Sequence, residues 1–236
     1  MALLSVTRTC ALAAVLLVAL SLCGCCSGVS RERIAVSCAD SPGPLIPKFC
    51  IATPNVLWAG GRPDRNDVTW LMQQGIRTIV DLEIFHDDRS ALAQATVSDS
   101  RTHQLRYYHV RDWEPLPMIA PSLEDDRVAR VLAIISEAPA PVFVHCRCGM
   151  KRADLMVAAH RVVIEGVSAE SAIRDLSRYG GAWSGPDTRY ILALSQRRDE
   201  MRRRIAELAP KLKADAFVTC TDGQCSVSDH DIGNDH

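Results

Sequence analysis

The chain lacks an excess of charge, a long apolar run and a recognisable set of metal ligands. Its 27 Lys and Arg residues nearly balance its 28 Asp and Glu residues, for a formal net charge of −1, so bulk charge predicts no nucleic-acid partner. The main apolar run, Cys10 to Leu22, is shorter than the about 20 residues that a membrane-spanning helix needs. The acidic and histidine residues from Asp229 to His236 do not have a known ligand spacing. We therefore expect no metal and no other cofactor.

The N-terminal segment has the pattern of a targeting signal. Arg8 is the only charged residue before the apolar run, and a Leu-Cys-Gly-Cys-Cys sequence follows that run. This sequence resembles a bacterial lipobox, which implies that Cys25 is lipidated, with Cys23 and Cys26 as alternatives. The other interpretation is an ordinary secretory signal that is cut within residues 27–30. We expect an exported protein of the cell envelope or periplasm, held on the membrane by a lipid anchor.

The remaining cysteines are consistent with export, because disulfides persist in oxidising compartments. Four of them lie on either side of the central region: Cys38, Cys50, Cys220 and Cys225. Four cysteines allow three pairings, and the sequence does not decide among them. The local pairs, Cys38–Cys50 and Cys220–Cys225, are the default expectation. Cys146 and Cys148 would then be the reduced thiols.

Strand patterns alternate with helical patterns through the middle of the chain. Apolar strand patterns cover residues 55–61, 76–82, 105–110 and 141–144, and helical patterns cover 63–74, 89–97, 122–137, 155–165, a stretch from 168, and 187–209. This alternation predicts an α/β fold, with a mostly parallel sheet flanked by helices. We assign the segments as a lipoprotein-type signal peptide over 1–25, a linker over 26–54, the catalytic domain over 55–212 and a polar flexible tail over 213–236.

One segment, Val144 to Ala153, carries the strongest chemical signal. A short apolar strand leads into Cys146, Arg152 follows after five residues, and an amphipathic stretch comes next. A loop over a helix N-terminus turns several backbone N–H groups into one hollow, which suits a phosphate group. The helix dipole and nearby cations there lower the pKa of a cysteine, and an arginine can bind two phosphate oxygens at once. These residues predict a phosphoryl-transfer site with Cys146 as the nucleophile.

The pattern His-Cys-x-x-Gly-x-x-Arg over residues 145–152 resembles the signature loop of the cysteine-dependent protein tyrosine and dual-specificity phosphatases. Residues 57–83 also resemble the start of the atypical dual-specificity phosphatases of bacteria, plants and fungi, so the resemblance extends from about Val56 to Leu194. It implies a phosphatase-like fold, catalytic Cys146 and Arg152, and a phospho-cysteine intermediate. The substrate-binding residues that it implies are Arg147, Cys148, Gly149, Met150 and Lys151.

The resemblance also implies a general acid, because the leaving group of a phosphate ester needs a proton. The family places this acid, usually an Asp, in a loop after the strand that here ends near residue 110. Asp112 is therefore the predicted acid and Glu114 the alternative. Asp125 and Asp126 fall inside a predicted helix, where Ser122 and Asp125 suggest a capping box and a solvated or capping role.

The residue after the loop arginine departs from the family. A Ser or Thr hydroxyl usually stands there and helps the thiolate leave, but this chain has Ala153. Ala153 therefore predicts slow turnover and supports an alternative function, a phosphate-binding pseudophosphatase. A further alternative is a thiol redox or sulfur-transfer enzyme that uses Cys146 and Cys148. The register of the loop motif and the upstream acid argue against this alternative.

The leading prediction is a phosphatase that acts on phosphate monoesters. Its substrate would be a phosphotyrosine protein, or an inositol phosphate or phosphoinositide if Arg147 and Lys151 make the pocket cationic. The sequence does not reveal the depth of the pocket, which separates these substrates. It therefore leaves the substrate open.

Overall fold

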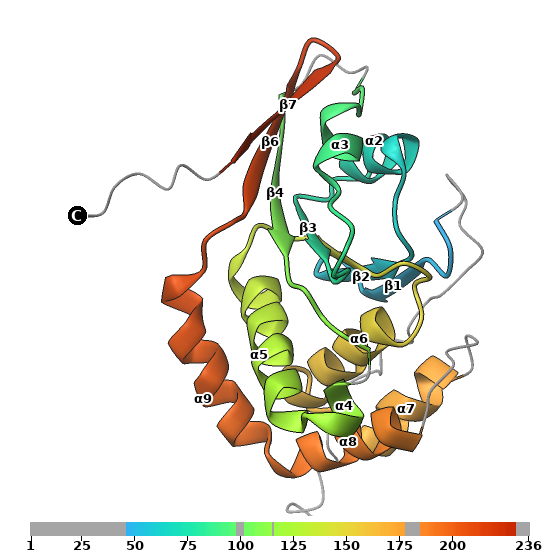
Figure 1. Ribbon diagram of the computed structural model, residues 1–236, viewed down its shortest axis with the longest axis vertical. Coiled ribbons are helices and arrows are strands. Elements are labelled where there is room, and N and C mark those ends of the chain that lie inside the picture. The colour runs from blue at the N-terminus through green and yellow to red at the C-terminus, as the bar shows by residue number, and fades with distance from the viewer. Residues whose placement is uncertain (1–45, 98–101, 115, 178–184, 230–236) are drawn as a thin grey trace, which may run out of the picture. The chain divides into compact units, whose positions relative to one another are not determined.

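A seven-stranded sheet, in the order β1-β2-β5-β3-β4-β6-β7, organises the computed structural model, which describes residues 46–97, 102–114, 116–177 and 185–229 (Figure 1). The four central strands are parallel to one another: β2 (Leu57–Gly60), β5 (Val142–His145), β3 (Thr78–Asp81) and β4 (His103–His109). The outer strands are antiparallel: β1 (Cys50–Thr53), β6 (Ala216–Thr221) and β7 (Gln224–Asp229). The predicted mostly parallel sheet is confirmed.

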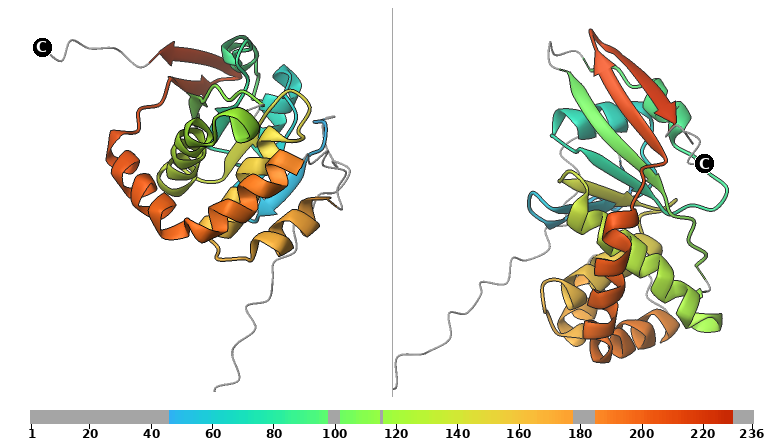
Figure 2. Two further views of the ribbon diagram at one scale, coloured as in Figure 1. Left: turned by 60° about the horizontal axis from the view of Figure 1, so that its bottom comes forward. Right: turned by 90° about the vertical axis from the view of Figure 1, so that its left-hand side faces the viewer.

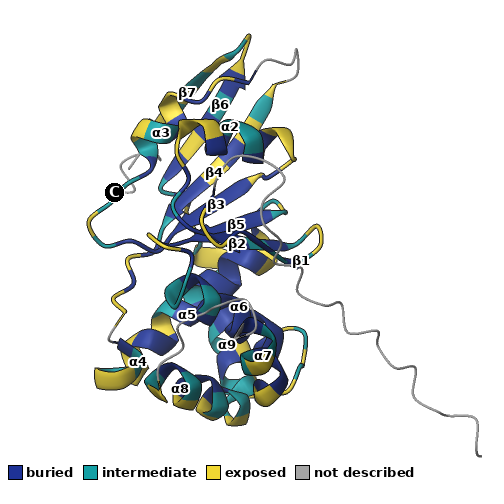
Figure 3. Ribbon diagram, turned by 90° about the vertical axis from the view of Figure 1, so that its right-hand side faces the viewer, coloured by how far each residue is buried: buried dark blue, intermediate teal, exposed yellow. Residues whose placement is uncertain are grey.

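Helices cover both faces of this sheet, as the alternating pattern predicts (Figure 2). One face packs against the helices α2 (Arg65–Gln73) and α3 (Arg89–Ala93). The other face packs against α5 (Pro121–Glu137) and α6 (Arg152–Val163). Four further helices extend that second layer: α4 (Leu116–Ile119), α7 (Ala169–Ser177), α8 (Gly185–Gln196) and α9 (Arg198–Leu208). Because both faces are covered, β3 and β5 are buried along their whole length, whereas β4 is partly exposed (Figure 3).

The register of the parallel strands sets the position of the site. Gly60, His145, Asp81 and His109 lie side by side as the last residues of β2, β5, β3 and β4. The loops that leave these strands therefore converge on one edge of the sheet, which is where α/β folds bind their ligands. Cys146 follows β5 directly at this edge.

The prediction of a flexible tail is wrong for residues 216–229. They form the hairpin β6–β7, which pairs with β4 and extends the sheet. Asp222 and Gly223 make the turn with φ angles of 52° and 82°, the left-handed conformations that a tight hairpin turn requires. The predicted linker also contributes structure, because its residues 50–53 form the edge strand β1.

The prediction of a capping box at Ser122 and Asp125 is also wrong. Helix α5 starts at Pro121, and the residue before it makes no side-chain cap. Asp125 is buried, accepts a hydrogen bond from the Tyr190 hydroxyl at 2.8 Å and forms an ion pair with Arg197. Asp126 forms an ion pair with Arg204 at 3.2 Å near the surface.

The last predicted helix is two helices, α8 and α9, which meet near Arg197. Of the predicted disulfides, Cys220–Cys225 is confirmed, and it closes the hairpin with a Cα–Cα distance of 4.0 Å. Cys50 is disulfide-bonded as well. Its predicted partner Cys38, the proposed lipidation site Cys25 and the whole signal segment lie outside the described residues. No helix among residues 46–97, 102–114, 116–177 and 185–229 has the length and apolarity to cross a bilayer.

Candidate active site

The loop between β5 and α6 has a tightly fixed backbone. Gly149 has a φ of +68°, and a Cβ atom there would lie 2.5 Å from the Gly61 nitrogen, so only glycine fits. The Gly61 N–H in turn donates to the Pro47 carbonyl at 2.7 Å. The segment before β1 and the end of β2 therefore support the catalytic loop from outside. Lys151, the last loop residue, also has a positive φ of 58°.

Cys146 lies at the start of this loop, and only 2% of its surface is exposed. Burial raises the pKa of its thiol, which the sequence did not predict. The N–H of Ala153, the charge of Arg152 and the N–H groups of Cys148 and Gly149 oppose this effect without cancelling it. The thiol donates to the Met150 carbonyl at 3.1 Å. The predicted ring of N–H donors is present, but a carbonyl in the same loop stabilises the protonated form.

Arg152 is the first residue of α6 and reaches across the edge of the sheet. Its Nη1 donates to the carbonyls of Leu82, at 2.8 Å, and of Asp112, at 3.1 Å. These bonds join the loops that follow β3 and β4 to the catalytic loop. They use one nitrogen of the guanidinium group, so the remaining N–H groups can still point to a phosphoryl group.

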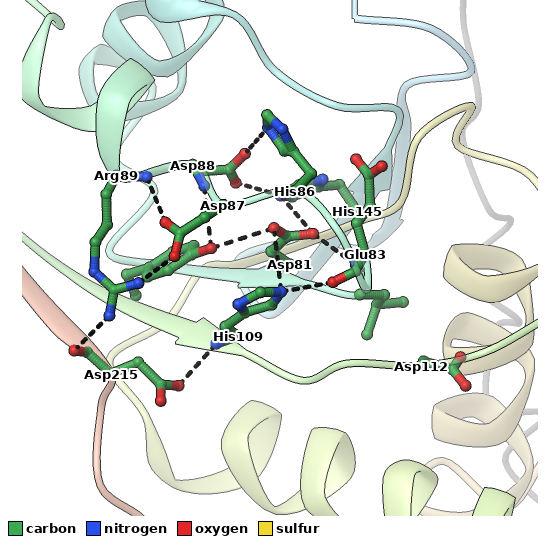
Figure 4. A network of polar contacts seen from close by, with 12 residues as sticks. Asp81, Glu83, His86, Asp87, Asp88, Arg89, His109, Asp112, His145 and Asp215 are labelled. Atoms are coloured by element: carbon green, nitrogen blue, oxygen red, sulfur yellow. Dashed lines mark hydrogen bonds and ion pairs between the residues drawn. The ribbon is translucent and has the colours of Figure 1, made fainter.

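His145 anchors the start of the loop through a buried ion pair. Its Nε2 lies 2.6 Å from Oδ2 of Asp88, and both side chains are fully buried (Figure 4). Burial alone would lower the pKa of His145, but Asp88, Asp81 and Glu83 raise it overall. Burial would likewise raise the pKa of Asp88, but the charge and hydrogen bond of His145 and the contact with His86 lower it. The ion pair therefore fixes the start of the loop, and His145 orients the residue that follows it, Cys146.

Further polar groups complete this network. Nε of Arg62 donates to Glu83 at 2.7 Å, and the guanidinium and carboxylate form a two-bonded ion pair. The Tyr107 hydroxyl donates to Asp81 at 3.2 Å, and Asp81 accepts the Glu83 N–H at 2.7 Å. Ligand atoms of Asp81, Glu83 and His145 lie within 4.8 Å of one another, an arrangement that could surround a cation. These atoms already have protein partners, however. That the protein binds no metal remains a prediction from its sequence.

Asp112, the predicted general acid, lies on the loop after β4, apart from the His145 network (Figure 4). Only 1% of its surface is exposed, and its Oδ1 has no hydrogen-bond partner among the described residues. Burial raises its pKa to about 6, although the charge of Arg152 and the neighbouring Glu124 act in the opposite direction. A carboxyl group with a raised pKa next to the loop arginine suits a proton donor.

Glu124 is a residue of this site that sequence reasoning missed. It lies in the first turn of α5, is fully buried and faces Asp112. A small pocket of about 10 Å³ lies beside the catalytic loop, and its lining includes Asp112, Glu114, Glu124, Lys151, Arg152 and Asp187. The sequence does offer a signal for Glu124, because it places a carboxylate in the first turn of a helix that comes after the acid loop.

The rim of the site differs from the cationic rim that the sequence suggested. Lys151 forms an ion pair with Glu114, the alternative general acid. Arg147 is exposed, and its carbonyl accepts the Arg62 N–H at 3.4 Å. Cys148 is an exposed free thiol. The implied substrate-binding residues from Arg147 to Lys151 thus contribute mainly backbone to the loop, and the one lysine is already paired.

Comparisons with known proteins agree with this arrangement. Residues 51–187, more than half of the chain, match the family described as DSP-PTPase phosphatase fused to NAD+ kinase. The chain is 27% identical over 166 residues to the dual specificity protein phosphatase TpbA of Pseudomonas aeruginosa strain UCBPP-PA14. That alignment covers 70% of this chain and 69% of TpbA.

Solved structures have the same fold. The crystal structure of P. aeruginosa TpbA matches with a TM-score of 0.54 at 24% identity, over 75% of this chain and 99% of that one. The core catalytic domain of the PP-IP phosphatase SIW14 of S. cerevisiae matches with a TM-score of 0.54 at 16% identity, over 72% and 96% of the two chains. The family match selects the phosphatase prediction over the thiol-redox alternative. The chain belongs to the DSP-PTPase family of cysteine-dependent phosphatases.

Proposed function

We propose that this phosphatase hydrolyses phosphate monoesters in two steps through a phospho-Cys146 intermediate. The observation that carries the proposal is the convergence of the N–H groups of Cys148, Gly149 and Ala153 and the charge of Arg152 on the Cys146 sulfur. These donors would bind the phosphoryl oxygens and favour the thiolate that attacks phosphorus. Asp112 would give a proton to the leaving oxygen.

The second step, hydrolysis of phospho-Cys146, lacks the hydroxyl that usually assists it. Ala153 is fully buried behind the loop and has no side-chain donor for the departing thiolate. Its N–H, which contacts the sulfur, is the donor that remains at this position. We therefore propose that breakdown of the phosphoenzyme limits turnover, which gives the chain slow catalysis and strong phosphate binding.

Among the candidate substrates, we favour a phosphorylated tyrosine side chain over a polyphosphorylated inositol. The small pocket beside the catalytic loop is lined by Lys151 and Arg152 together with the carboxyl groups of Asp112, Glu114, Glu124 and Asp187. Such a lining repels additional phosphate groups at its rim. A variant of TpbA was solved in complex with phosphotyrosine, and that ligand carries a single phosphate.

A panel of phosphomonoesters tests this proposal. We expect the purified protein to release phosphate from phosphotyrosine peptides faster than from inositol hexakisphosphate. Cys146→Ser should abolish turnover and keep vanadate binding, because an unactivated hydroxyl is a poor nucleophile. EDTA should leave the rate unchanged. Full activity of Cys146→Ser, or loss of activity in EDTA, would contradict the proposed mechanism.

We also propose that the protein is exported and anchored to the cell envelope through a lipid on Cys25. The lipobox-like sequence supports this, and so does the Cys220–Cys225 disulfide, since such bonds persist in oxidising compartments. Cys25→Ala should move the protein from the membrane fraction to the soluble fraction of a bacterial host. Retained lipid labelling in that variant would assign the anchor to Cys23 or Cys26 instead.

A further inference from the structure

Asp112 and Glu124 form a pair of buried carboxyl groups beside Arg152. Asp112 is 1% exposed and Glu124 is fully buried, and both line the same small pocket as the loop arginine. The two side chains face each other. Neither oxygen of Glu124 has a hydrogen-bond partner, and neither has Oδ1 of Asp112, among the residues that the structure describes.

This environment does not allow both groups to be charged. Two carboxylates that face each other repel, and the compensating groups, which are the Trp113 N–H and the charges of Arg152 and Arg127, act on Asp112. A proton held between the two groups removes one charge and supplies Glu124 with a hydrogen bond. The geometry alone therefore predicts one proton per pair at neutral pH.

The charged groups around the pair agree with this assignment. Burial and the charge of Asp112 raise the pKa of Glu124 to about 9, whereas the pKa of Asp112 is about 6. The proton thus resides on Glu124 at neutral pH. The neighbouring groups act in both directions: Arg152 and Arg127 lower the pKa of Asp112, while Asp125 and Asp187 raise that of Glu124.

We propose that Glu124 is a positioning residue that stores the catalytic proton and supplies it through Asp112. The inference rests on the proposed function of Asp112 as general acid. The role of Glu124 is to keep a proton available to Asp112 at pH values where an Asp without this partner would have lost it. Glu124 acts through Asp112 and needs no contact with the substrate.

The proton balance closes over the two chemical steps. As the Cys146 thiolate bonds to phosphorus and the ester bond breaks, the pair's single proton passes from Glu124 through Asp112 to the leaving oxygen, which leaves the pair briefly without a proton. Water then attacks phospho-Cys146, the sulfur–phosphorus bond breaks, and a water proton returns to Asp112. The pair therefore begins and ends each turnover with the same number of protons.

The pH profile of Glu124→Gln tests this role. Glutamine keeps the size and can donate a hydrogen bond to Asp112, but it cannot give up a proton, so the alkaline limit of general-acid catalysis should move from about pH 9 to about pH 6. For a substrate with a poor leaving group, such as phosphoserine, kcat/KM should fall about 100-fold at pH 8 and remain near the wild-type value at pH 5. An aryl phosphate with a good leaving group should change far less.

Two control variants separate this effect from a structural one. Asp126→Asn removes a carboxylate from the exposed side of the same helix, and it should leave both profiles unchanged. Glu124→Asp keeps a proton donor at this position and should restore part of the activity at pH 8. A uniform loss at all pH values in Glu124→Gln, without rescue by Asp, would overturn the proposal in favour of a packing role.

Infrared spectroscopy distinguishes failure of this inference from failure of the proposed function. At pH 7 to 8 the wild-type protein should show the C=O band of a protonated carboxylic acid, and Glu124→Gln should lose it. Absence of the band in the wild type overturns the inference even if the enzyme is active. Burial also raises the pKa of Asp154 to about 7, so only the part of the band that Glu124→Gln removes reports on the pair. If that part is present in a protein without phosphatase activity, the function proposal has failed while the protonated pair exists.

Discussion

Two groups of buried acidic side chains lie near the carboxyl edge of the sheet, and they differ in how their charges are compensated. The His145 network pairs each of its carboxylates with a donor: Asp88 with His145, Glu83 with Arg62, and Asp81 with Tyr107 and a backbone N–H. Asp112 and Glu124 face mainly each other. The partners of Asp88 and Glu83 lower the pKa values of these two carboxyl groups, although burial raises the pKa of Asp81. Burial raises the pKa values of both Asp112 and Glu124, so the second group is the one suited to hold a proton.

The first group supports the catalytic loop, whereas the second group takes part in proton transfer. Paired buried charges fix the backbone on which the nucleophile lies, since His145 precedes Cys146 directly. Unpaired buried carboxyl groups have raised pKa values, which reactions that move protons require. Removing a charge should consequently have opposite effects on stability in the two groups.

The largest effect should come from breaking the ion pair of the His145 network. Asp88→Asn leaves the His145 charge buried without its partner, which should cost about 3–5 kcal/mol of the free energy of unfolding. Urea denaturation at pH 7 measures this loss. Retained wild-type stability would show that a neutral His145 is tolerated.

The pH dependence of stability should identify the same pair. The pKa of Asp88 is lowered by folding, so its contribution is lost as the pH falls through that lowered value. The pKa of His145 is raised, so its contribution is lost as the pH rises through that raised value. The pair thus stabilises the fold in the window between these two pKa values, and Asp88→Asn should flatten the curve there.

Asp112→Asn should affect catalysis without loss of stability. It should lower kcat by about 10²–10³ for substrates with poor leaving groups, the usual scale of general-acid loss. Because the change removes a buried charge that lacks full compensation, the free energy of unfolding should stay equal or rise. Parallel measurements of kcat and urea midpoint for Asp112→Asn and Asp88→Asn test the comparison directly.

The sequence predicted the local parts of the site and missed members of both groups. The catalytic loop, Arg152 and the acid loop follow local patterns of strand, turn and helix, which a sequence records directly. Glu124 was missed because its role depends on the angle at which α5 meets the loop after β4. The contacts of Arg62, Glu83 and Asp88 with the loop likewise join segments far apart in the chain.

The hairpin β6–β7 shows a different failure of prediction. Strand β7 is mostly polar because it is an edge strand that is partly or fully exposed, although β6 alternates buried residues with more exposed ones. The Asp222-Gly223 turn between two alternating segments was an available hairpin signal. The pKa of Cys146 was predicted in the wrong direction because sequence shows the N–H donors and the arginine but not the depth of burial.

The next largest effect should come from Ala153→Ser. It should act on the hydrolysis of phospho-Cys146, the step that follows proton donation by Asp112. A hydroxyl beside Arg152 can donate to the departing thiolate, and a hydrogen bond to a charged group is worth about 1.5–3 kcal/mol, or roughly 10–100-fold in rate. Pre-steady-state kinetics should show a burst in the wild type and a smaller burst with faster turnover in Ala153→Ser. An unchanged kcat and no burst in either protein would mean that phosphoenzyme hydrolysis is not limiting.

The smallest effect should come from the ion pair at the rim, between Lys151 and Glu114. This pair links the acid loop to the catalytic loop at the surface, where an exposed ion pair contributes about 0.2–1 kcal/mol. Glu114→Gln should free Lys151 to attract the substrate phosphate and raise kcat/KM by less than about 5-fold. The gain should shrink in high salt, because the charges are solvent-exposed.

The same variant decides between the two candidate acids. If Glu114 only holds Lys151, Glu114→Gln leaves the ratio of rates for good and poor leaving groups unchanged, and Lys151→Met abolishes the gain. If Glu114 is instead the proton donor, Glu114→Gln lowers kcat selectively for poor leaving groups, and Asp112→Asn does not. That result would assign the general acid to Glu114 at the exposed rim. The buried pair of Asp112 and Glu124 would then have no role in proton transfer. The near-complete burial of Asp112 and the paired, half-exposed position of Glu114 favour the first outcome.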